Sequence, residues 1–161
     1  MFNLNEIVDL AIRIEKNGES VYRKAQREVT QPYISSILQG LADDEAEHEE
    51  WFIRFKEKAG TNVEDQKLEE MGRSILQSVL GDQAFSIAEA DFSKTEDIKS
   101  LLKLSIEFEK DTILFYEMLK SFVEDTEVLN GLDKIIEEEN RHVKQLEDLA
   151  EREEALPLTR E

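Results

Sequence analysis

Cysteine is absent from this chain of 161 residues. The absence excludes disulfides, zinc–thiolate sites, iron–sulfur clusters and thiol nucleophiles. Proline and glycine are scarce, with two and six residues, so few positions interrupt a helix. No apolar run approaches the ~18 residues of a membrane-spanning helix, and the N-terminus lacks the apolar segment with basic flanks of a secretion signal. We therefore expect a helical cytoplasmic protein with no membrane partner.

Positive charge is also in short supply, because 20 lysines and arginines face 38 aspartates and glutamates, a formal net charge of −18. Nucleic-acid-binding proteins usually carry a basic patch or stripe, so we expect no nucleic-acid partner. The length suits a single domain with its own hydrophobic core, residues 1–161. Most acidic residues are expected on solvated helix faces, which leaves only a few carboxylates for chemistry.

Histidine occurs only twice, at His48 and His142. Each histidine follows a glutamate, Glu45 or Glu139, by three residues. Residues three apart lie on the same face of a helix, so each pair presents a carboxylate and an imidazole to one point. In so acidic a chain a single Glu-x-x-His pair arises easily by chance, and its surroundings decide its meaning.

The sequence pattern around each Glu-x-x-His pair occurs twice in the chain, as two copies. Glu15 and Glu109 lie 30 residues before the glutamates of the two pairs, and each residue of one copy is offset by 94 from its counterpart. Both copies also contain the string Glu-Lys, five residues, then Tyr. We interpret the chain as two copies of a helical hairpin, about residues 3–59 and 97–153, joined by a crossover, residues 60–96.

Apolar periodicity predicts four long helices. The first begins at Asn3, which can cap it, and ends before Pro32. The others span about residues 32–59, 97–122 and 126–153.

The crossover is too long to be structureless in a compact domain. Its apolar positions predict a short helix near residues 68–80, followed by a looser stretch around residues 85–92. Two tight hairpins and one long crossover between helices two and three are the connectivity of a ferritin-like four-helix bundle. That all-α bundle is the predicted fold.

Glu45 and Glu139 stand in apolar surroundings, on seams whose spacing alternates three and four residues and should face the core. The seam residues are Leu38, Leu41, Glu45, His48, Phe52 and Phe55 in one copy and Leu132, Ile135, Glu139, His142, Leu146 and Leu149 in the other. A buried ionised carboxylate is costly unless it is compensated, and no lysine or arginine lies on either seam. Two divalent cations would balance the four glutamates, so we predict a two-metal site.

The predicted metal ligands are Glu15, Glu45, His48, Glu109, Glu139 and His142. Oxygen-rich ligation with one imidazole for each metal favours iron, with manganese or zinc as the other choices. Glu45 and Glu139 are placed to bridge the metals, and Glu15 and Glu109 to bind one metal each. Six protein ligands leave positions open for O₂, peroxide or water, which indicates a reactive site.

Other residues have two interpretations. Tyr22 and Tyr116, two turns after Glu15 and Glu109, either hydrogen-bond a ligand carboxylate or are core aromatics. Glu19, one turn after Glu15, is either an auxiliary ligand or exposed. For Trp51, Phe52 and Phe55 the two interpretations are core packing, which is the prediction, and an electron path. A solvated face is the prediction for the acidic residues around His48, which are Asp43, Asp44, Glu47, Glu49 and Glu50.

The segments AIRIEKNGESVYRKA (residues 11–25) and SIEFEKDTILFYEML (residues 105–119), together with the two Glu-x-x-His pairs, resemble the rubrerythrin-like branch of the ferritin-like di-iron carboxylate superfamily. The resemblance implies a di-iron site held by the six residues named above. Members of this branch form homodimers or larger homo-oligomers and reduce peroxide or oxidise Fe²⁺, so the same is expected here.

Two departures from rubrerythrin proper stand out. The chain has no cysteine and hence no rubredoxin domain, so the resemblance implies a separate electron-donor protein as partner. Rubrerythrins also carry an extra glutamate one turn from the third-helix ligand, whereas Ile106 and Thr112 stand one turn either side of Glu109. The predicted function is a di-iron oxidoreductase of the peroxide-reductase or ferroxidase type. The alternative is a non-catalytic iron-binding, storage or sensing protein.

Overall fold

The computed structural model describes residues 4–58, 95–121 and 123–155, which form four long helices and no strand. The helices are α1 (Leu4–Glu28), α2 (Pro32–Lys58), α5 (Thr95–Lys120) and α6 (Thr126–Ala155). The predicted bounds of α2, α5 and α6 lie within two residues of these, whereas α1, predicted to end just before Pro32, already ends at Glu28. The predicted helix cap at Asn3 and the predicted short helix and loose stretch of the crossover lie outside the described residues.

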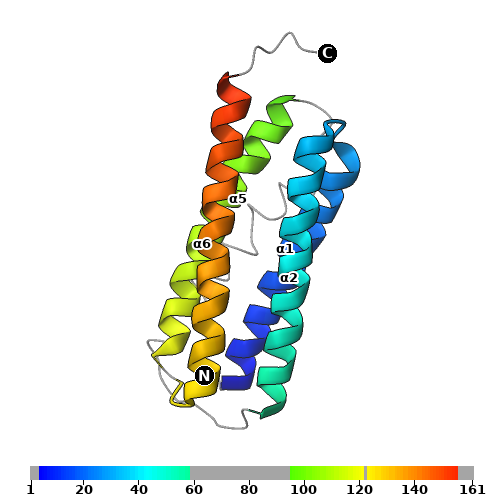
Figure 1. The fold of residues 1–161 in the computed structure, drawn as a ribbon. Coiled ribbons are helices and arrows are strands. Elements are labelled where there is room, and N and C mark those ends of the chain that lie inside the picture. Colours follow the sequence, from blue (N-terminus) through cyan, green and yellow to red (C-terminus); the bar gives the residue numbers. More distant parts are fainter. Residues whose placement is uncertain (1–3, 59–94, 122, 156–161) are drawn as a thin grey trace.

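The direction of the helices accounts for the long crossover (Figure 1). Helices α1 and α6 run toward one end of the bundle, while α2 and α5 run the opposite way. Therefore α2 ends at the opposite end of the bundle from the start of α5, and the chain between them must cover the length of the bundle. The fold is the predicted ferritin-like four-helix bundle, with one long connection between its second and third long helices.

Local sequence explains where the described helices start. Pro32 is the first residue of α2, a position where its missing N–H costs no hydrogen bond. Asp125 caps α6, because its Oδ1 accepts hydrogen bonds from the backbone N–H groups of Glu127 at 2.9 Å and Val128 at 3.2 Å. Such a cap satisfies N–H groups that have no partner within the helix.

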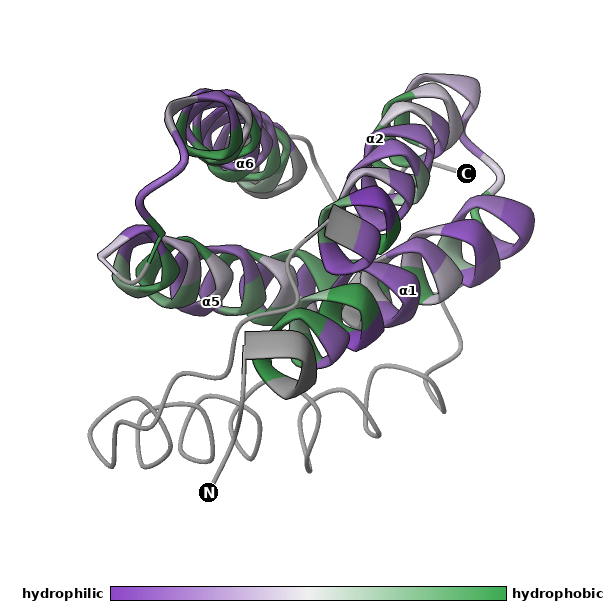
Figure 2. Ribbon diagram, turned by 90° about the horizontal axis from the view of Figure 1, so that it is seen from below, coloured by the Kyte–Doolittle hydropathy of each residue, from purple (hydrophilic) through white to green (hydrophobic). Residues whose placement is uncertain are grey.

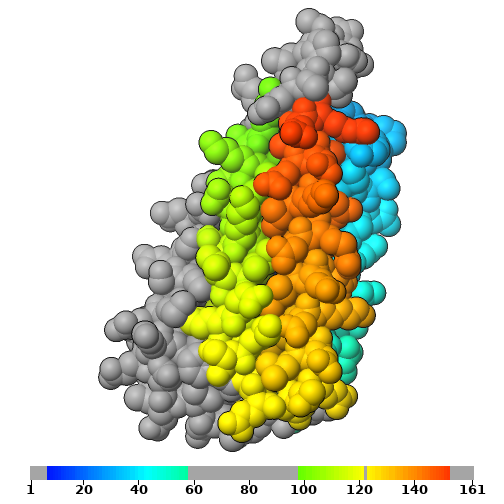
Figure 3. Space-filling view, turned by 60° about the vertical axis from the view of Figure 1, so that its left-hand side comes forward, coloured from blue at the N-terminus to red at the C-terminus, as the bar shows by residue number. Residues whose placement is uncertain are grey.

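The packing of α6 joins the two hairpins. Figure 3 shows α5 and α6 side by side along the molecule, with α2 on the other side of α6. Figure 2, which looks along the bundle, shows that each helix has both hydrophilic and hydrophobic sides. No described helix is long and apolar enough to cross a membrane.

The buried apolar residues form two clusters of different composition. One cluster, which we call the aromatic cluster, contains Tyr116 and the buried phenylalanines Phe52, Phe55, Phe108 and Phe115. The other, the aliphatic cluster, has Tyr22 as its sole aromatic member among the described residues. All twelve residues of the two predicted seams are buried. Leu104 of α5, which is offset by 94 from the buried Leu10 of α1, is only half-buried.

Candidate metal centre

Six polar side chains from all four helices are buried together. Each is at most 3% exposed. They are Glu15 on α1, Glu45 and His48 on α2, Glu109 on α5, and Glu139 and His142 on α6. Residues from opposite ends of the chain meet because the hairpins pack with their Glu-x-x-His faces toward each other.

The six residues form two overlapping groups. Ligand atoms of Glu15, Glu45, His48 and Glu139 all lie within 4.8 Å of one another, and the same holds for the group Glu45, Glu109, Glu139 and His142. Glu45 and Glu139 belong to both groups and therefore lie between the other four residues. This is the arrangement expected of two neighbouring cations that share two carboxylates.

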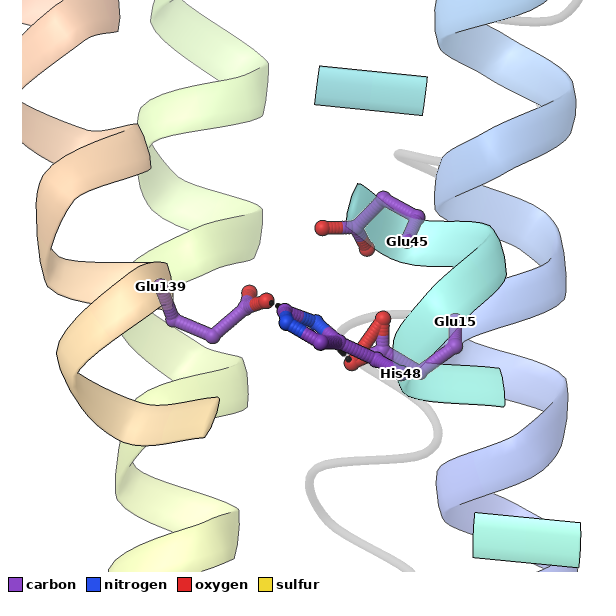
Figure 4. A group of neighbouring side chains, drawn as sticks. All are labelled: Glu15, Glu45, His48 and Glu139. Carbon is purple, nitrogen blue, oxygen red and sulfur yellow. Dashed lines mark ion pairs between the residues drawn. The ribbon is translucent and has the colours of Figure 1, made fainter. Parts of the chain in front are cut away.

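In both histidines Nδ1 is the ring atom that faces the shared centre. His48 Nδ1 lies 2.8 Å from Glu139 Oε1 and 3.4 Å from Glu15 Oε1. Figure 4 shows Glu139 reaching from α6, and Glu15 from α1, toward the ring of His48. Similarly, His142 Nδ1 lies 3.2 Å from Glu45 Oε1. Imidazole nitrogen and carboxylate oxygen thus converge from different helices on the same small volume.

The hydrogen bonding of the buried carboxylate and imidazole atoms shows whether the site suits metal cations. The buried atoms without a hydrogen-bond partner include both oxygens of Glu45 and of Glu139, Oε2 of Glu15 and of Glu109, and Nδ1 of His48 and of His142. The imidazole nitrogens lie close to the carboxylates, but these contacts do not have the geometry of hydrogen bonds. Buried polar atoms in folded proteins nearly always have partners, so such a concentration requires another occupant. The described part of the chain buries no lysine or arginine. Two divalent cations would satisfy these atoms and neutralise the four carboxylates.

The two tyrosines hold the outer glutamates in a crossed pattern. The Tyr22 hydroxyl donates a 2.8 Å hydrogen bond to Glu109 Oε1, and the Tyr116 hydroxyl donates a 2.8 Å bond to Glu15 Oε1. Burial, reinforced by the partner carboxylate, raises the pKa of each tyrosine well above its usual value. Each phenol therefore stays a donor, and Oε2 of each of these glutamates is left without a hydrogen-bond partner.

Asp44 combines a solvated position with a contact to the site. Its side chain is 41% exposed, as the predicted solvated face implies, yet its Oδ2 lies 2.9 Å from Nε2 of His142, a contact that the sequence did not predict. That hydrogen bond lowers the pKa of Asp44. On the other side, Glu138 Oε1 lies 3.6 Å from Nε2 of His48. A carboxylate on the outer nitrogen orients a histidine ligand and increases its basicity.

The signal for Asp44 and Glu138 was present in the sequence. Each directly precedes a Glu-x-x-His glutamate, and the two are also offset by 94 residues. The contacts run between α2 and α6, so they depend on how these helices pack.

Glu19 is not part of the site. Glu19 pairs with Arg23 at 3.2 Å, and it belongs to neither ligand group found among the described residues.

Gly18 leaves space for the carboxylate of Glu45, because a Cβ at position 18 would lie 2.6 Å from Glu45 Oε2. The carboxylate of Glu45 thus rests against the backbone of α1.

Electrostatics in the centre favour proton retention when no cation compensates the charge. Burial, together with the neighbouring carboxylates, raises the pKa of both Glu45 and Glu139 well above the usual value. Burial lowers the pKa of the histidines, but Glu139 and Glu15 outweigh it at His48 and raise that pKa to about 11. At His142, Asp44 and then Glu109 outweigh burial and raise the pKa to about 10. Cations bound here must displace protons.

A four-helix bundle that buries four glutamates and two Glu-x-x-His histidines in overlapping groups defines a ferritin-like di-metal carboxylate protein. The rubrerythrin family model matches residues 6–150. The chain therefore belongs to the rubrerythrin family.

A solved structure has the same fold. It is the crystal structure of a candidate ferritin-like diiron-carboxylate protein from Thermotoga maritima, which is 23% identical to this chain with a TM-score of 0.74. The match covers 92% of this chain and 95% of that one. No curated protein matches the sequence.

Proposed function

We propose that the protein is a di-iron carboxylate oxidoreductase that reduces hydrogen peroxide or O₂ with electrons from a separate donor protein. The observation that carries the proposal is the set of buried, unpartnered carboxylate and imidazole atoms between four helices. A site built only for stability would pair these groups with cationic side chains, and the described core contains none.

The two ligand groups indicate which residues would hold each ion. Glu15 and His48 would bind one ion and Glu109 and His142 the other, with Glu45 and Glu139 shared. Carboxylate-rich ligation with one imidazole for each metal favours iron. Bound iron would supply the redox chemistry, by changing between Fe²⁺ and Fe³⁺.

Hydrogen bonds from neighbouring side chains position the proposed ligands. Tyr22 and Tyr116 donate hydrogen bonds to the outer carboxylates, and Asp44 orients His142. The aromatic and aliphatic clusters lie on either side and exclude bulk water from the polar layer. Reduction of one H₂O₂ to two waters consumes two electrons and two protons, and in this proposal the external donor restores the electrons.

Stopped-flow mixing of the anaerobic Fe²⁺-loaded protein with H₂O₂, and separately with O₂, tests the proposal. The wild type should oxidise rapidly with at least one of them. The double variant Glu45→Gln, Glu139→Gln should lose the fast phase, because it removes both shared carboxylates. A matched control is Glu47→Gln, Glu137→Gln, since these glutamates lie exposed on the same helices. Equal rates for the two double variants would refute the proposal.

The same experiment separates the rival functions. Faster oxidation by H₂O₂ than by O₂ indicates a peroxide reductase, whereas the reverse indicates a ferroxidase. Storage would require a closed shell and uptake of many irons per chain, so size-exclusion mass and iron stoichiometry distinguish it. We propose that the assembly is a homodimer or larger homo-oligomer, which the size-exclusion measurement also tests.

A further inference from the structure

The two tyrosines that hold the outer glutamates have different surroundings. Tyr22 and Tyr116 are equivalent in the 94-residue repeat, and each donates one hydrogen bond of 2.8 Å to a glutamate. However, Tyr116 lies in the aromatic cluster, and Tyr22 lies in the aliphatic cluster. The repeat is therefore broken at the tyrosines' neighbours and not at the tyrosines themselves.

A continuous series of ring contacts leads from Tyr116 to the surface. Tyr116 lies against Phe52, with ring centroids 5.0 Å apart, and Phe52 lies against Trp51, with centroids 5.1 Å apart in an edge-on arrangement. Trp51 is the single tryptophan of the chain and is partly exposed. The edge of its indole packs on Gly131, where a Cβ would collide with the ring. The indole is thus held in one place at the protein surface.

Among the described residues, Tyr22 has no comparable series of ring contacts. The repeat counterparts of Trp51 and Phe52 are Gln145 and Leu146. Leu146 is fully buried in the same cluster as Tyr22. Packing alone is served equally well by leucine and phenylalanine, as the two halves of the protein show. An oxidisable indole next to a ring-lined route exists only on the Glu15 side of the described structure.

We propose that Trp51, Phe52 and Tyr116 form a one-electron path between the protein surface and the Glu15 side of the metal centre, and that Tyr22 is not part of such a path. Tyr116 gives up one electron, for which peroxide is the final acceptor. Its phenol proton moves along the existing hydrogen bond to Glu15 Oε1, which leaves a neutral tyrosyl radical. Trp51 then returns one electron to Tyr116 as the proton comes back. An external one-electron donor restores the indole radical cation, so the surface at Trp51 is where that donor docks.

The use of the path in turnover rests on the proposed function, with peroxide as the final oxidant and two passages for each peroxide. The path itself is a property of the folded chain and does not depend on iron. It can therefore be tested in the Zn²⁺-loaded protein, in which the metal is redox-inert.

The test is flash photo-oxidation of the Zn²⁺-loaded protein by a ruthenium tris-bipyridine complex with a sacrificial electron acceptor. Tyr33→Phe serves as the background, because Tyr33 is 52% exposed and would react directly. The two remaining tyrosines are 1% and 0% exposed, so the bulky complex cannot reach them. Transient absorption and electron paramagnetic resonance should show an indole radical that decays into a tyrosyl radical.

Three further variants in that background locate the path. The tyrosyl signal should be lost in Tyr116→Phe, retained in Tyr22→Phe, and lost in Trp51→Phe. Metal content and thermal unfolding show that each variant is folded and loaded. A tyrosyl signal that survives Tyr116→Phe or Trp51→Phe, or no tyrosyl signal in the background protein, overturns the proposal. Peroxide reduction by the iron form is measured separately, so failure of the path and failure of the proposed function are distinguishable.

Discussion

The hydroxyl of Tyr116 donates a 2.8 Å hydrogen bond to Oε1 of Glu15, although the two residues belong to different helical hairpins. Its counterpart, the bond from Tyr22 to Glu109, crosses in the opposite direction. These bonds tie α1 to α5 on both sides of the centre. Because no hairpin supplies both members of either bond, the outer carboxylates are positioned only after the hairpins dock.

Replacing Tyr116 by phenylalanine should weaken metal binding. The change removes the donor that holds Glu15 and leaves a buried carboxylate oxygen unpaired, at a cost of about 1–3 kcal/mol. Loss of such an outer partner typically lowers metal affinity by roughly 10-fold or more. Competition for Zn²⁺ against a chelator measures the effect. Tyr33→Phe is the control, because Tyr33 is exposed, and an affinity of Tyr116→Phe equal to that control would contradict the prediction.

Asp44→Asn should lower metal affinity more than Glu138→Gln does. Asp44 makes a 2.9 Å hydrogen bond to His142, while Glu138 lies 3.6 Å from His48, beyond hydrogen-bond distance. We expect a loss of roughly 10–100-fold at one of two sites for Asp44→Asn. Zn²⁺ titration by calorimetry resolves the two sites. Equal losses in the two variants would show that the difference in distance has no consequence.

Gly18→Ala should impair metal binding, whereas Gly40→Ala should stabilise the folded protein. A Cβ at position 18 would lie 2.6 Å from Glu45 Oε2, so the shared carboxylate must move and metal stoichiometry or affinity should fall. A Cβ at position 40 meets nothing within 4 Å. Alanine is a better helix former than glycine, so Gly40→Ala should raise the free energy of unfolding by about 0.5–1 kcal/mol. Urea unfolding and metal analysis of both variants check the pair, and normal metal binding by Gly18→Ala would count against the assigned position of Glu45.

The metal-free protein should lose stability as the pH rises. His48 and His142 have folded pKa values of about 11 and about 10, against an ordinary value of 6.5. The folded state therefore binds more protons than the unfolded state above pH 6.5, and the free energy of unfolding falls as the pH increases. This contribution is complete below pH 6.5 and is lost as the pH passes through about 10 and about 11.

Thermal unfolding in the presence of a chelator measures this dependence. The double variant His48→Gln, His142→Gln should show a flatter pH profile. Zn²⁺ should reverse the trend, because bound cations displace the protons and their affinity rises with pH. An equal slope in wild type and double variant would mean that other groups cause the loss.

Much of the fold and of the candidate site was predictable from the sequence. Helix periodicity is local, since it depends on 3.6 residues per turn. It located all four helices, three of them within two residues at both ends. The same period placed Glu45 and His48 on one face, and likewise Glu139 and His142. The absence of compensating cations on the seams then predicted a two-metal site, and the six residues do converge. Iron as the metal, the donor protein, the single domain and the oligomer stay predictions.

The sequence alone sets which side chains face the core, because a helix fixes the direction of each residue relative to its neighbours along the chain. Which of these side chains touch one another is set by the tertiary structure. It crossed Tyr22 to Glu109 and Tyr116 to Glu15, and it brought Asp44 to His142. It also gathered the described buried phenylalanines in the cluster of Tyr116 and not in that of Tyr22. Such contacts depend on the packing of helices far apart in sequence, and helical periodicity carries no information about that packing.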